Sequence, residues 1–194
     1  MSKVLGIACS PRRSSNSSYL LTKFMQGVRE RGLETEEVNL SDLKFQCCQA
    51  CEACSLTGEC VLTDDLSRLF DRVDGIDGLV IAAPVYAMAI NTLGKAMVER
   101  VQVFWARHYR LALPLPAESK PGFFISTAGT TLPQVFECAV KPVRYFYHVL
   151  GMKWSGELLV NPVDKPGEIL QHLDWLERAQ LRGFEFADKI SQRG

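Results

Sequence analysis

Residues 3–18 read KVLGIACSPRRSSNSS, an apolar run followed by a stretch of serines, arginines and one asparagine. The apolar part, Lys3–Cys9, is short and stops at a Ser-Pro pair, which is typical of a buried strand. Apolar residues then recur at helical spacing over Asn16–Arg31, just before a glycine. The polar loop therefore joins the carboxyl end of a strand to the amino end of a helix.

The same alternation of strands and helices continues along the chain. Strand 78–83, GLVIAA, is apolar throughout, as expected for a strand covered on both faces of a parallel sheet. Further strands are expected at 34–40, 122–126 and 154–160, and further helices at 63–73, 91–105, 132–150 and 169–190. Pro142 should kink or divide its helix. Five strands alternating with helices predict a doubly wound α/β fold, because parallel strands need crossover connections.

The 194 residues fit one domain, 1–194, with a cysteine-rich loop at 46–62 after the second strand. The expected architecture is flavodoxin-like: a five-stranded parallel sheet in the order 2-1-3-4-5, with helices on both faces. In that order the ligand crevice lies at the carboxyl ends of the first and third strands.

Charge and hydropathy exclude several partners. Lys and Arg number 22, as do Asp and Glu, so no basic excess favours nucleic acid. No stretch approaches the roughly 18–20 apolar residues of a membrane span, and the N-terminus does not resemble a signal peptide. We therefore expect a cytoplasmic protein without a membrane partner.

The loop after the first strand has the composition of an anion site. It offers hydroxyls, an amide and free backbone N–H groups at a helix N-terminus, and Arg12 or Arg13 can add a charged donor. It is neither a Walker A loop nor a G-x-G-x-x-G fingerprint, so a monophosphate such as that of FMN suits it better than a pyrophosphate. An ordinary Ser/Asn-rich helix cap remains the alternative.

Two further loops favour a ligand site over an ordinary helix cap. Ala83–Met88 follows the third strand, and Thr127–Thr130 follows the fourth, where Gly129 allows the backbone to approach a flat ring closely. Each by itself could be a simple turn. Together, at three carboxyl ends of one parallel sheet, they outline one crevice.

Five of the seven cysteines fall within residues 47–60, in the pattern Cys48-x2-Cys51-x2-Cys54-x5-Cys60. Disulfides are rare in a reducing compartment, so the pattern favours metal ligation. Four thiolates with two residues between successive ligands are typical of a [4Fe-4S] cluster, whereas zinc sites usually use two separated C-x2-C pairs.

The other interpretations of the cysteines stay open: zinc, thiol chemistry, or an empty site. Cys47 could replace Cys48, although the first gap then becomes three residues. Cys9 and Cys138, which have apolar neighbours, are expected in the core.

Parts of the sequence resemble a known family. KVLGIACSPRRSSNSS resembles the GSPR-x-x-SN-[ST] opening of NADPH-dependent FMN reductases, and residues 83–100, APVYAMAINTLGKAMVER, resemble their PVY…K-x-x-x-[DE]-R segment. With its cysteines, the chain is similar to the iron–sulfur flavoproteins, which carry a compact C-x2-C-x2-C-x(4–7)-C motif. Ala87-Met88 stands where that family usually has an aromatic residue and a glycine.

The resemblance implies specific roles. The residues implied to hold the FMN phosphate are Ser10, Arg12, Ser15, Asn16 and Ser17. Those implied to border the ribityl chain and ring are Pro84, Val85, Tyr86, Asn91, Thr127, Ala128 and Gly129. The implied cluster ligands are Cys48, Cys51, Cys54 and Cys60. The resemblance also implies a homodimer or homotetramer in which the cysteine loop of one chain lies close to the FMN of its neighbour.

FMN together with a cluster predicts an electron-transfer flavoprotein whose cofactors, not its side chains, carry the chemistry. It would pass electrons between a ferredoxin-like or NAD(P)H donor and a small acceptor, an oxygen species or a quinone. One alternative is an NAD(P)H-dependent FMN or quinone reductase that uses flavin alone, with zinc-binding or structural cysteines. Another is a non-enzymatic flavin-binding redox sensor.

Overall fold

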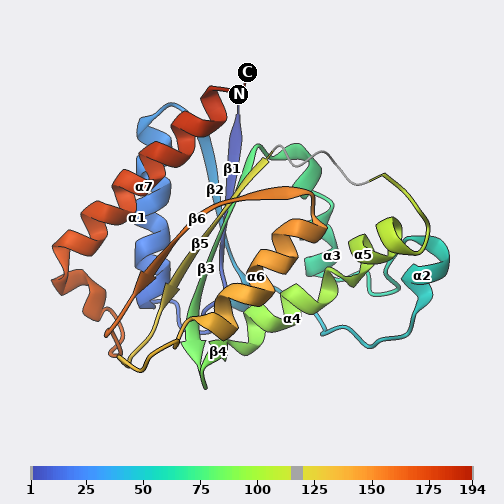
Figure 1. Cartoon of the computed structure of the whole chain (residues 1–194), viewed down its shortest axis with the longest axis horizontal. Coiled ribbons are helices and arrows are strands. Elements are labelled where there is room, and N and C mark those ends of the chain that lie inside the picture. Colours follow the sequence, from blue (N-terminus) through green and yellow to red (C-terminus); the bar gives the residue numbers. More distant parts are fainter. Residues whose placement is uncertain (1, 115–119, 194) are drawn as a thin grey trace.

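The computed structural model describes residues 2–114 and 120–193, and its centre is a parallel sheet in the order β2-β1-β3-β5-β6 (Figure 1). These strands span β1 Lys3–Ala8, β2 Glu34–Asn39, β3 Gly78–Tyr86, β5 Lys120–Thr127 and β6 Met152–Val160. A sixth, short strand, β4 Ala89–Ile90, folds back antiparallel on the end of β3. When only the five long strands are numbered along the chain, their order is 2-1-3-4-5, which confirms the predicted flavodoxin-like arrangement.

Helices cover both faces of the sheet (Figure 1). On one face lie α1 Asn16–Glu30 and α7 Leu173–Ser191. The other face carries α3 Asp65–Phe70, α4 Thr92–Arg100 and α6 Glu137–Val149. Farther from the sheet on that side lie α2 Ala53–Thr57 and α5 Gln102–Tyr109 (Figure 1). Single 3-10 turns occupy Leu40–Asp42, Val73–Gly75 and Glu168–Gln171.

Side chains of β3 show why this strand is apolar throughout. Leu79 and Ile81 pack into the core beneath α3, α4 and α6, whereas Val80 and Ala82 pack into the core beneath α1 and α7. All four are fully buried. Successive side chains of a strand point to opposite faces, so a strand covered twice must be apolar at every position.

Two glycines let α1 and α7 approach each other closely. A Cβ on Gly27 would lie 2.2 Å from the carbonyl oxygen of Gln180, and one on Gly183 would lie 2.0 Å from that of Phe24. No side chain fits at such distances. The helix pair therefore covers its face of the sheet as one closely packed layer.

Several predicted boundaries differ from the structure. The helix expected over 91–105 is two helices, α4 and α5, and the helix expected from Leu132 begins at Glu137. The expected last helix, 169–190, starts with a 3-10 turn before α7 begins at Leu173. Pro142 lies inside α6 and does not divide it. Cys138 is exposed rather than in the core. Among the described residues, no helix is long and apolar enough to cross a membrane.

Candidate functional site

The predicted loops meet in a cleft at the carboxyl end of the sheet. The residues that line it are Ser10, Arg12, Ser15, Asn16, Pro84, Val85, Tyr86, Thr127, Gly129, Val163, Asp164 and Pro166. All three predicted loops are therefore present, and a fourth, after β6, joins them. Three predicted residues, Ser17, Asn91 and Ala128, are buried outside this lining.

The phosphate loop is shaped by its own hydroxyls. Ser15 caps α1: its side chain accepts a hydrogen bond from the N–H of Ser18 at 3.1 Å. Ser10 Oγ accepts one from the N–H of Arg12, also at 3.1 Å. The remaining N–H groups of the first turn of α1 stay available to an anion in the cleft, where the helix dipole adds attraction.

Asn16 connects the phosphate loop to the fourth loop, which the sequence analysis missed. Its Nδ2 donates to the carbonyl of Lys165 at 3.1 Å, and its Oδ1 accepts from the N–H of Ile169 at 3.2 Å. Glu168 stiffens the same loop by accepting from the N–H groups of Asp164 and Lys165. The available signal was the turn-forming stretch NPVDKPG at 161–167, after the fifth long strand.

Asn91 lies beneath the cleft. Its Nδ2 donates to the carbonyl of Cys9 at 2.6 Å, and only 2% of the residue is exposed. This bond ties the start of α4 to the end of β1. In this arrangement Asn91 supports the phosphate loop from below.

Only part of the cleft is enclosed. Its volume is about 100 Å³, below the roughly 300–1,000 Å³ of most ligand pockets. The adjoining hairpin leaves Tyr86 39% and Met88 41% exposed. A ligand as large as FMN could place only one end in the enclosed part, and its ring would lie along the open surface.

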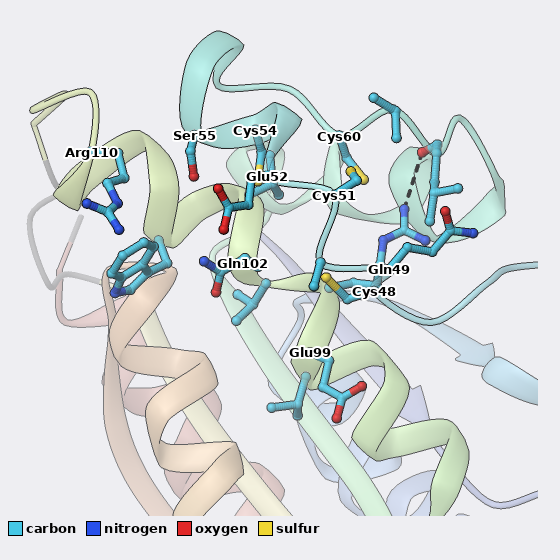
Figure 2. Close-up of a pocket in the computed structure, with 18 of the residues that line it drawn as sticks. Cys48, Gln49, Cys51, Glu52, Cys54, Ser55, Cys60, Glu99, Gln102 and Arg110 are labelled. Atoms are coloured by element: carbon cyan, nitrogen blue, oxygen red, sulfur yellow. Dashed lines mark hydrogen bonds between the residues drawn. The ribbon is translucent and has the colours of Figure 1, made fainter.

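The four cysteines of the C-x2-C-x2-C-x5-C pattern line a second, larger cavity of about 730 Å³. Figure 2 shows Cys48, Cys51, Cys54 and Cys60 on the side of the loop and α2, with Gln102 and Arg110 on the opposite wall. Residues of α4 and α6 complete the lining. Cys47 is exposed and is not part of it.

The sulfur atoms are close enough to influence one another. Burial raises the pKa of Cys54, and the charges of Cys60, Cys48 and Cys51 raise it further. Like charges in one place disfavour ionisation. Four thiolates in this cavity would therefore need a cation among them.

As placed, the thiols surround the cavity and do not meet at one point. Within residues 2–114 and 120–193, no three His, Cys, Asp or Glu side chains form a group that could hold a metal ion. Tetrahedral zinc requires four ligands around a single ion, with sulfur at about 2.3 Å. A [4Fe-4S] cluster is held by four cysteines that bind different irons. The number and kind of donors around the cavity fit the cluster.

A buried ion pair lies at the edge of this cavity. Its arginine ends the 83–100 segment quoted in the sequence analysis, which gave it no role. Arg100 Nη1 lies 2.7 Å from Asp64 Oδ2, with side chains 2% and 17% exposed. Burial alone would raise the pKa of Asp64, but hydrogen bonds from Arg100 and from the N–H groups of Gln46 and Ser67 lower it to about 2. Asp64 also caps α3.

Comparison with known proteins identifies the family. The model of the NADPH-dependent FMN reductase family matches residues 2–150. The chain belongs to this family. Its members' flavin is FMN, and the chain is therefore an FMN-dependent oxidoreductase.

Curated relatives in this family point to one branch. An iron–sulfur flavoprotein of Methanosarcina thermophila is 28% identical over 155 residues, which are 80% of this chain and 78% of that protein. Another, from Methanocaldococcus jannaschii, is 31% identical over 98 residues, about half of each chain (50% and 51%). The chain belongs to the iron–sulfur flavoprotein branch of the FMN reductase family.

Solved structures support the fold. A flavone reductase superposes with a TM-score of 0.72 at 18% identity, covering 97% of this chain and 63% of that one. An NAD(P)H:quinone oxidoreductase from Methanothermobacter marburgensis superposes with a TM-score of 0.68 at 19% identity, covering 95% and 96%. At these identities the likeness establishes the flavodoxin-like fold alone.

Proposed function

We propose that this chain is an electron-transfer flavoprotein that carries FMN and a [4Fe-4S] cluster held by Cys48, Cys51, Cys54 and Cys60. It passes electrons between a ferredoxin-like or NAD(P)H donor and a small acceptor, an oxygen species or a quinone. The observation that carries the proposal is the single cavity that all four cysteines line, apart from the FMN cleft. The names of the archaeal relatives support it.

The chain's own residues bind and orient. When bound, FMN exchanges electrons in pairs or singly, and the cluster exchanges them singly. The first turn of α1, with Ser10 and Arg12, would hold the FMN phosphate, while Tyr86 and Gly129 would border the flavin ring. The cysteine loop would supply four thiolates, whose combined charge the cluster irons would compensate.

We further propose a homodimer or homotetramer in which a second copy covers the flavin. The small enclosed volume of the cleft and the exposed Tyr86 and Met88 beside it support this proposal. Molecular mass in solution, measured with and without FMN, tests it. A monomer that binds FMN with full affinity contradicts it.

Metal and flavin analysis of protein purified without air tests the proposed cofactors. The wild type should contain about four irons per chain and one FMN. Replacing any one of Cys48, Cys51, Cys54 and Cys60 by serine should lower iron below about one per chain and leave FMN in place. Cys47→Ser and Cys138→Ser are the matched controls and should keep their iron.

The flavin-only reductase is the second candidate, and one observation favours it: the cysteines as placed do not form a group for a single ion. It predicts iron-free wild-type protein, containing zinc or no metal, with full NADPH oxidase activity. Bound FMN without turnover of any nicotinamide or quinone would instead indicate a redox sensor.

A further inference from the structure

Arg100, the last residue of α4, is almost completely buried and uses most of its guanidinium donors. Its Nη1 donates to the carbonyl of Gln46 at 2.8 Å and to Asp64 Oδ2 at 2.7 Å. Its Nη2 donates to the carbonyl of Leu62 at 3.2 Å, to Asp64 Oδ1 at 3.2 Å and to Ser67 Oγ at 2.8 Å. One side chain thus bonds to four different residues.

The two carbonyls among these acceptors stand at the two ends of the cysteine run. Gln46 precedes Cys48 by two residues, and Leu62 follows Cys60 by two. The N–H of Gln46 also donates to Asp64, at 3.0 Å. The Arg100–Asp64 ion pair therefore holds both ends of the loop that carries all four cysteines, next to the hydrogen-bonded pair of Lys44 and Asp65. A planar guanidinium can hold several acceptors at fixed angles, which a lysine ammonium cannot do.

One guanidinium donor is left over. The Nε of Arg100 is buried and has no hydrogen-bond partner among the described residues. Cys60 lines the same cavity as Arg100.

We propose that Arg100 is a positioning residue for the cysteine site: it holds both ends of the loop, and its remaining buried Nε–H is available to the Cys60 thiolate at the same cavity. The inference rests on the proposed cluster and deepens it. Hydrogen bonds to sulfur and nearby positive charge stabilise the reduced, more negative form of a cluster, and both are determinants of its reduction potential. Arg100 should therefore raise that potential.

The first test is the cluster potential of protein purified without air. Arg100→Gln should lower the equilibrium constant for one-electron reduction at least tenfold, about 59 mV. Arg100→Lys keeps the charge and should recover part of the loss. Lys95→Gln is the matched control: it removes another cation that lines the same cavity and forms an exposed ion pair with Glu99. The equilibrium constant for one-electron reduction of the cluster in Lys95→Gln should stay within about threefold of the wild-type value.

The second test needs no metal. In iron-free protein, Arg100→Gln should increase amide hydrogen exchange at 46–62 at least tenfold and leave 10–18 unchanged. If Arg100→Gln does not fold, Ser67→Ala, which removes one acceptor, should give a smaller increase at the same residues. Unchanged exchange at 46–62 in the folded variants, or an unchanged potential in iron-loaded Arg100→Gln, overturns the inference. A wild type that never takes up iron refutes the proposed cluster, while the exchange result still decides whether Arg100 holds the loop.

Discussion

The FMN cleft lies beyond the start of α4, whereas the cysteine cavity runs along α4 from Lys95 to Arg100. Asn91, just before α4, bonds to the end of β1 beside the phosphate loop, and Arg100, its last residue, lines the cysteine cavity. The helix is nine residues long, about 13.5 Å. The first three loops of the cleft each continue a buried strand, whereas the cysteine loop follows the edge strand β2 and contains only the short α2.

The two sites differ in the interactions that fix their loops in position. Sheet hydrogen bonds place the ends of β1, β3 and β5 side by side, so the cleft loops start from fixed positions. The cysteine loop is instead held by side chains: Arg100 and Asp64 at its two ends, and Arg107, which donates to the carbonyl of Gly58 in its middle. Changes at the ion pair should therefore affect the cysteine site, and changes at the cleft should affect FMN alone.

The largest expected effect is that of Asp64→Asn. It leaves the buried Arg100 charge without its carboxylate, which should lower the free energy of unfolding by about 3 kcal/mol. Chemical denaturation measures this loss. The control is Asp42→Asn, which breaks only the exposed pair with Arg13 and should cost less than about 0.5 kcal/mol. Equal losses in the two variants would contradict the role of the ion pair.

The same ion pair predicts a dependence of stability on pH. The pKa of Asp64 is about 2 in the folded protein, against about 3.9 in an unfolded chain. A lowered pKa contributes stability that is fully present above pH ~5 and is lost as the pH falls toward 2. The gap in unfolding free energy between wild type and Asp64→Asn should therefore narrow by about 2 kcal/mol from pH 6 to pH 2. A constant gap would show that the Asp64 carboxylate is not the source.

At the cleft, Gly129→Ala should weaken FMN binding. Its Cβ would lie 2.7 Å from Asp164 Oδ1 and 2.9 Å from Asp164 Cβ, so the fourth loop must move away. We expect about a tenfold loss of FMN affinity, or 1.4 kcal/mol, with iron content unchanged. Flavin fluorescence titration measures it. Gly75→Ala, at a glycine with open space around it, is the control. A parallel loss of iron would show that the two sites are not separable.

The smallest effect is expected at the hairpin beside the cleft. Ala87 and Met88 have φ angles of 48° and 64°, in the left-handed region where glycine is favoured. Met88→Gly should therefore raise the free energy of unfolding by about 1 kcal/mol. Ala89→Gly, one residue later in β4, should lower it by about 0.5–1 kcal/mol. Thermal unfolding of both variants measures these changes in stability. A Met88→Gly variant less stable than the wild type would contradict the prediction.

Sequence reasoning succeeded where local pattern and tertiary structure agree. The alternation of strands and helices, with polar loops at the ends of three strands, predicted the sheet order and three of the four cleft loops. Strand ends were placed less accurately: β3 continues through Pro84 to Tyr86, because it pairs with β4 and with the end of β5. The spacing of apolar residues within the strand does not indicate that pairing. The fourth loop was missed because its link to the phosphate loop runs through Asn16, far away in the sequence.

The sequence by itself determined the fold class, the position of the phosphate loop and the set of cysteines, because these depend on periodicity and spacing within short stretches. Only the tertiary structure decided that Arg100 closes the cysteine loop and that Asn16 and Asn91 support the cleft. Those contacts join residues 36 to 153 positions apart. The packing of the helices on the sheet decides which distant groups a buried polar side chain can bond. No pattern within a short stretch of sequence indicates those partners.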